Sequence, residues 1–106
     1  MKKIHIAIGV SDIAKSVEDY SIRLDCQPSV VIPNEYALWR TETLNFSIRK
    51  VSEFPGTLRH LGWEDPAVSV FTQDTDTNGI VWERFNADLQ ADEIKKAWPQ
   101  SDDNPS

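Results

Sequence analysis

Cysteine is nearly absent from this chain of 106 residues, in which Cys26 stands alone and no intramolecular disulfide can form. The main sequence argument for a secreted, cross-linked domain is therefore missing, and we expect a reduced, cytoplasmic environment. Long apolar runs are lacking too. The run that follows the two N-terminal lysines ends at Ser11 without a cleavage site, and no segment is long enough to span a membrane.

Basic residues are outnumbered, because 11 Lys and Arg stand against 17 Asp and Glu, for a net charge of −6. This charge opposes binding to nucleic acid or anionic membranes and favours cationic ligands, although many ordinary soluble domains are equally acidic. Glycine-rich phosphate loops are also missing. Neither Cys26 nor Ser11 has the sequence context of a catalytic nucleophile.

The first half of the chain has a regular pattern of strands and one helix. In residues 4–10, aliphatic residues alternate with His5, Ala7 and Gly9, which predicts a strand with His5 on the face opposite the isoleucines. Apolar residues then recur at helical spacing from position 13 to 24, and this stripe is expected to pack on the isoleucine face. Further strands are expected over residues 29–32, 35–40 and 44–51.

The second half follows a break at residues 54–56. Strands are expected over residues 57–63, 67–72 and 79–85, with an Asp-rich turn at 73–79. A short helix is expected over residues 88–98, ended by Pro99, and residues 100–106 are expected to form a flexible tail.

Three residues in separate predicted strands suit a divalent transition metal: His5, His60 and Glu83. Two imidazoles and one carboxylate form a donor set that leaves coordination positions open for a substrate. Each residue also has an ordinary structural interpretation, since a strand histidine is often only hydrogen-bonded and Glu83 could be a solvated charge. The metal hypothesis therefore depends on whether the three side chains converge.

Four other residues are candidates to line a ligand pocket. Arg40 and Arg49 could neutralise an anionic group of a substrate, and Trp39 and Trp63 could supply apolar or stacking walls. Surface arginines and core tryptophans are the competing structural interpretation.

The chain resembles the glyoxalase, bleomycin-resistance and extradiol-dioxygenase superfamily, also called vicinal oxygen chelate proteins. The resemblance covers residues 3–86 and rests on IHIAIGVSDIAKSVEDY, RHLGW and DTNGIVWERF. It implies an α+β fold of two βαβββ modules that form a cup around the site, often in a dimer. We therefore expect one domain over residues 1–99, with a first module at 1–53, a second at 57–86 and the helix at 88–98.

The second module departs from the family's pattern, because residues 58–85 have room for three strands but not for the crossover helix. A sheet face without its helix would expose apolar surface. We expect either the helix at 88–98 to fold back over that face or a second copy of the chain to cover it, which would give a homodimer. If the cup does not close, the three candidate ligands would not meet.

The resemblance places His5, His60 and Glu83 at three of the family's four metal positions. The fourth falls at Ser47, which is a poor ligand and is grouped with the candidate substrate-binding residues. These positions imply a divalent metal, iron, manganese, nickel or zinc, and a small substrate with neighbouring oxygens, handled by a lyase or dioxygenase. Two alternatives stay open: a metal-free protein that sequesters a cationic aromatic ligand, as in the bleomycin-resistance branch, and a degenerate domain without activity.

Overall fold

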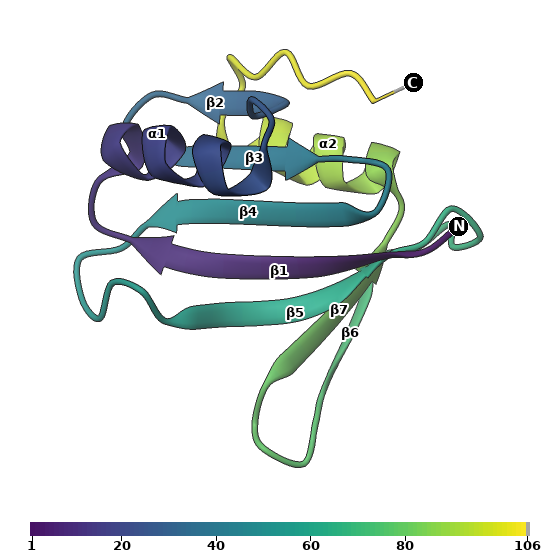
Figure 1. Cartoon of the computed structure of the whole chain (residues 1–106). Coiled ribbons are helices and arrows are strands. Elements are labelled where there is room, and N and C mark those ends of the chain that lie inside the picture. The colour runs from purple at the N-terminus through teal and green to yellow at the C-terminus, as the bar shows by residue number, and fades with distance from the viewer. Residues whose placement is uncertain (106) are drawn as a thin grey trace.

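The computed structural model describes residues 1–105 and has an α+β fold (Figure 1). The elements in chain order are β1 (Lys3–Val10), α1 (Ile13–Leu24), β2 (Val30–Ile32), β3 (Tyr36–Arg40), β4 (Leu44–Lys50), β5 (Leu58–Glu64), β6 (Thr72–Thr75), β7 (Val81–Phe85) and α2 (Ala87–Ala97). The α+β class predicted from the sequence is confirmed.

All strands belong to one mixed sheet of seven strands in the order β2-β3-β4-β1-β5-β7-β6. The central strand β1 pairs in parallel with β4 and antiparallel with β5, and β5 pairs in parallel with β7. Strand β1 therefore joins the first half of the chain to the second. Because paired residues on neighbouring strands point to the same face, this register decides which side chains meet.

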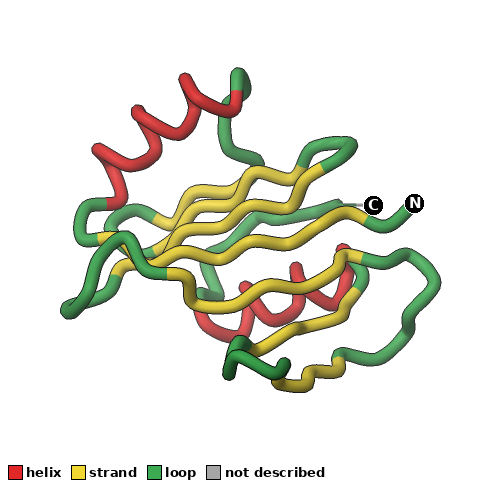
Figure 2. The backbone as a smooth tube through the Cα atoms, turned by 60° about the horizontal axis from the view of Figure 1, so that its bottom comes forward, coloured by secondary structure: helices red, strands yellow, loops and turns green. Residues whose placement is uncertain are grey.

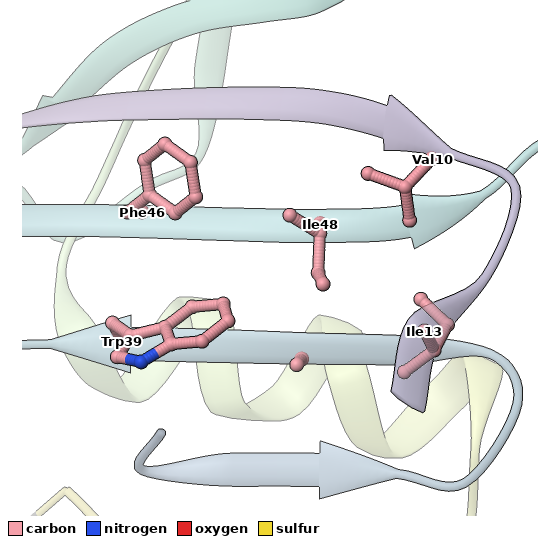
Figure 3. Close-up of a cluster of buried hydrophobic side chains, with 6 residues drawn as sticks. Val10, Ile13, Trp39, Phe46 and Ile48 are labelled. Atoms are coloured by element: carbon pink, nitrogen blue, oxygen red, sulfur yellow. The ribbon is translucent and has the colours of Figure 1, made fainter. Parts of the chain in front are cut away.

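Helix α1 covers one face of the first half. Its N-terminus is capped by the Asp12 side chain, which accepts a hydrogen bond from the Lys15 amide, and Asp25 ends it in the left-handed conformation. Ile13 packs with core residues of β1, β3 and β4, and Figure 3 shows Trp39 in the same cluster. The predicted packing of this helix against the aliphatic face of β1 is confirmed.

Helix α2 lies on the opposite face of the sheet (Figure 2). Ile94 packs against buried residues of β2 and β3, with Trp98 beside them. The expectation that this helix would replace the missing crossover helix is wrong, because α2 covers strands of the first half on the other face. Leu61, Trp63 and Trp82, which the register places on the α1 side, remain partly exposed. Within residues 1–105, neither helix combines the length and apolar character needed to cross a bilayer.

The predicted strand at residues 67–72 is also wrong. Asp65 organises a turn here, since its side chain accepts from the Ala67 amide and its carbonyl accepts from the Val68 amide. The strand β6 begins at the last residue of the predicted strand and runs into the stretch expected to be a turn, and the Asp76 side chain then accepts hydrogen bonds from the amides of Asn78 and Ile80. The hydrogen bonds of Asp65 therefore favour a turn over residues 65–68, where the apolar residues had suggested a strand.

The C-terminal segment packs more closely than a flexible tail would. The Asp103 carboxylate is 4% exposed and its Oδ1 lies 2.9 Å from Nη1 of Arg40, so the tail is fixed to β3 by a buried ion pair. Ser106, also assigned to the expected tail, lies outside the described residues.

Candidate metal centre

The sheet register brings the three predicted ligands to one face. His5 on β1 is paired with Gly62 on β5, and Gly62 is paired with Glu83 on β7. His60 lies two residues before Gly62 and therefore points to the same side. Gly62 carries no side chain, so the His5 and Glu83 side chains can approach each other across β5.

The three candidate ligand atoms have the spacing of a metal site. His5 Nε2 lies 2.9 Å from His60 Nε2 and 3.9 Å from Glu83 Oε1, and His60 Nε2 lies 3.0 Å from Glu83 Oε1. The point equidistant from three atoms with these separations lies about 2.0 Å from each, which matches zinc bonds to imidazole and carboxylate of roughly 2.0–2.2 Å. The residues present therefore fit a divalent transition metal.

Burial keeps His5 in the neutral form that a metal ligand requires. The residue is 2% exposed, and its burial lowers the pKa of the imidazole, although the hydrogen bond with Asn45 acts in the opposite direction. His5 Nδ1 lies 2.7 Å from Asn45 Oδ1. If the Asn45 oxygen faces His5, Nδ1 must carry the proton and Nε2 keeps its lone pair for a metal. The orientation of the Asn45 amide therefore decides the tautomer of His5.

A chain of buried polar groups fixes that amide. Arg40 can only donate, so Gln90 Oε1 must accept from Arg40 Nη2 at 2.9 Å. Gln90 Nε2 consequently donates to Asn45 Oδ1 at 3.1 Å, and Asn45 Nδ2 donates to Glu64 Oε1 at 2.8 Å. Asn45 Oδ1 is thus an acceptor, so His5 Nδ1 is a donor and the lone pair of Nε2 faces His60 and Glu83.

The same argument assigns the proton of His60. Because His5 Nε2 and the carboxylate Oε1 of Glu83 are both acceptors, the group between them, His60 Nε2, is the donor in the metal-free protein. Metal binding at His60 Nε2 would require this proton to move to Nδ1, the tautomer that leaves the Nε2 lone pair free for the metal.

A pocket of about 220 Å³ opens over this cluster. Its walls include Ser47, Tyr36 and Trp98, and the centroids of the Tyr36 and Trp98 rings lie 4.9 Å apart. Sites for drug-sized ligands are typically 300–1,000 Å³, so the volume suits a small compound. Burial raises the pKa of the Tyr36 hydroxyl to about 12, which keeps this group neutral.

Two arginines also line the pocket, Arg49 from β4 and Arg59 from β5. Strict alternation would put Arg59 on the face opposite His60. However, Ala7 pairs with His60 whereas Ile8 pairs with Leu58, so Arg59 is the extra residue of a β-bulge. Partial burial and the positive charge of Arg49 lower the pKa of Arg59.

The remaining predicted pocket residues have different outcomes. Ser47 and Arg49 do line the pocket, whereas Arg40, Trp39 and Trp63 do not. Arg40 belongs to the buried polar chain, and Trp39 is fully buried on the α1 side, where its Nε1 donates to the Cys26 carbonyl. Trp63 shares the α1 side of the sheet with Ile4, its partner on β1.

Several pocket residues were missed by the sequence analysis: Tyr36, Arg59, Phe71, Phe85, Gln90 and Trp98. The alternation of side chains along β3 could have predicted Tyr36 as a pocket residue, because Tyr36 lies on the same face as Arg40. No sequence signal marks the bulge at Arg59 or the inward orientation of Gln90.

Comparison with models of protein families and with curated proteins found no match to this sequence.

Proposed function

We propose that this protein binds a divalent transition metal through His5, His60 and Glu83 and uses it on a small molecule with neighbouring oxygen atoms. The observation that carries the proposal is the common point about 2.0 Å from all three ligand atoms, set by their separations of 2.9, 3.0 and 3.9 Å. A bound metal would supply Lewis-acid polarisation of the substrate oxygens. A lyase or a dioxygenase reaction fits this arrangement.

The order of elements supports the resemblance to the vicinal oxygen chelate superfamily. Residues 3–50 run strand, helix and three strands, and their sheet order is β2-β3-β4-β1. The second half keeps the strands that carry His60 and Glu83 and lacks the helix. We propose that the chain is a glyoxalase-like protein with a shortened second module.

The chain's own groups prepare the pocket for such a ligand. Asn45 holds His5 with its Nε2 lone pair toward the cluster, and the buried Phe85 ring contacts the His5 ring edge-on, with centroids 5.0 Å apart. Ser47, at the fourth metal position implied by the family resemblance, lines the same pocket but is not proposed as a metal ligand. These contacts orient the donor atoms before metal or substrate arrives.

The test is the melting temperature of the protein after chelation and after return of manganese, iron, nickel or zinc, together with the metal content as purified. Ligand at about 100 times Kd stabilises a fold by about 2.7 kcal/mol, which should raise the melting temperature by roughly 10–20 °C in a domain of this size. His60→Ala should lose this shift with its metal-free fold retained. Glu93→Gln, at the pocket wall, should keep it. An equal shift in His60→Ala would remove His60 from the ligand set.

The alternative of a cationic aromatic ligand has less support. Its predicted walls, Trp39 and Trp63, do not line the pocket, and the arginines that do, Arg49 and Arg59, would repel a cation. The net charge of −6 is the remaining argument for it. Absence of any metal-induced shift in the experiment above would favour this alternative or a domain without activity.

We also propose a homodimer. Leu61, Trp63 and Trp82 form a partly exposed apolar strip where the second half has no helix, and a second copy would cover it. Sedimentation equilibrium measures this directly, and a monomer at high concentration would contradict it.

A further inference from the structure

Arg59 reaches the pocket only because of an irregularity in the sheet. The extra residue between the Ala7–His60 and Ile8–Leu58 pairs turns the Arg59 side chain onto the pocket face. Bulges of this kind often re-aim a side chain next to a functional site. A second guanidinium is thereby added to the face that already carries Arg49.

These two arginines lack acidic partners. The ion pairs found within residues 1–105 include those of Arg23, Arg40 and Arg84, but none of Arg49 or Arg59. Arg49 instead lies over the Trp98 ring, with its guanidinium carbon 5.1 Å from the ring centroid. Stacking on an aromatic face leaves the N–H groups at the edge of the guanidinium available for a planar or tetrahedral oxyanion.

The charges around the pair favour an external anion. Among the pocket residues, Glu83 lies 3.0 Å from His60 and acts on Arg59 only through its charge, and the exposed Glu93 on α2 pairs with Lys96 at 3.4 Å. The positive charge of Arg49 acts on Arg59, and no carboxylate among the described residues forms an ion pair with either arginine, so an anion that binds between them relieves their repulsion.

We propose that Arg49 and Arg59 form an anion-binding subsite that selects small ligands bearing a carboxylate or phosphate group. The apolar rings of Trp98 and Phe71 line the same pocket and suit the carbon skeleton of such a ligand. The part of this inference that concerns the other end of the ligand rests on the proposed function, in which that end meets the His5, His60 and Glu83 cluster. The substrate class is then a small organic acid or phosphate ester with oxygen atoms remote from its anionic group.

The subsite is tested without metal, so that its outcome is independent of the metal experiment. Metal-stripped, ¹⁵N-labelled protein is titrated with inorganic phosphate and, separately, with benzoate at constant ionic strength, and the arginine Nε–H resonances are followed by NMR. Saturable shifts of the Arg49 and Arg59 signals are expected with at least one probe. Phosphate alone identifies a phosphoryl ligand, benzoate alone a carboxylate, and both indicate that either group is accepted.

Matched variants decide whether the arginines are responsible. Arg59→Gln and Arg49→Gln should each reduce the affinity for the bound probe by at least tenfold, because each substitution removes a charge-assisted hydrogen bond. Arg23→Gln removes an exposed arginine paired with Asp19 and should leave the affinity unchanged. The amide spectrum of each variant reports whether it is folded. Absence of saturable shifts with both probes, or equal affinity in Arg59→Gln and the unmodified protein, would overturn the proposal.

Discussion

Replacement of Asn45 by leucine tests the buried polar chain behind the candidate ligands. Asn45 is fully buried and makes four hydrogen bonds, to His5, Glu64 and Gln90. Leucine has a similar shape, so the change removes polar partners without opening a large cavity. Glu64 keeps its ion pairs with Arg40 and Lys3, whereas His5 Nδ1–H and Gln90 Nε2 lose their partners.

The expected cost follows from these two unpaired buried donors. Each unsatisfied group costs about 1–3 kcal/mol, so Asn45→Leu should reduce the free energy of unfolding by roughly 2–6 kcal/mol. For a domain of this size, the melting temperature should fall by at least about 10 °C. Because stabilities of about 5–15 kcal/mol are usual, the variant should still fold at low temperature.

The same variant should weaken metal binding. Without Asn45, the proton of neutral His5 can move to Nε2, and loss of the group that hydrogen-bonds a ligating histidine typically costs 10–100-fold in metal affinity. Urea unfolding measures the first effect and metal titration of the folded variant the second. Ser47→Ala is the control, since Ser47 lies on the same strand and face and is 3% exposed, and it should cost no more than about 1.5 kcal/mol.

Two results would refute this reasoning separately. An Asn45→Leu protein as stable as Ser47→Ala would show that the polar chain does not hold the sheet face together. Reduced stability with unchanged metal affinity would show that Asn45 does not set the donor atom of His5.

Two further predictions concern backbone approach and alkaline pH. A Cβ at position 62 would lie 2.4 Å from the Glu83 carbonyl oxygen, so Gly62→Ala should cost about 1–3 kcal/mol in urea unfolding and weaken metal binding. The control is Gly9→Ala, whose new Cβ would meet only the Val51 side chain and which should cost less. Equal costs of the two substitutions would refute the role of close backbone approach at Gly62. The folded-state pKa of Tyr36 is raised from 10.0 to about 12, so its contribution to stability is complete below pH 10 and is lost as the pH rises toward 12. Tyr36→Phe should lack this loss of roughly 2–3 kcal/mol, and parallel pH profiles of the two proteins would contradict the assignment.

The elements with regular periodicity were predictable from the sequence. The alternation of β1 and the helical spacing of α1 follow from burial against a single face, and the structure confirms both. The burial of β1 was less predictable. His5 and Ala7 are more buried than Ile4, Ile6 and Ile8, because the second half has no helix over the isoleucine side.

The candidate site was partly predictable for a different reason. Residue type identified His5, His60 and Glu83, since few side chains suit a transition metal. Their convergence and the roles of Arg40 and Arg59 depend on long-range pairing, which no local pattern encodes. Arg40 was expected to meet a substrate, but Asp103, 63 residues later, neutralises it. Arg59 required the bulge.

The absence of a helix between β5 and β7 leaves the candidate ligand cluster intact because the cluster depends on three strands. β1 pairs with β5 and β5 with β7, and this row alone aligns His5, Gly62 and Glu83. The helix that the family resemblance predicts for the second half would cover the opposite face, where no candidate ligand lies. Helix α2 contributes to the pocket face instead, through Gln90, Ile94 and Trp98. The sheet register alone therefore brings the three candidate ligand atoms together, although no helix lies between β5 and β7 and an apolar strip stays partly exposed.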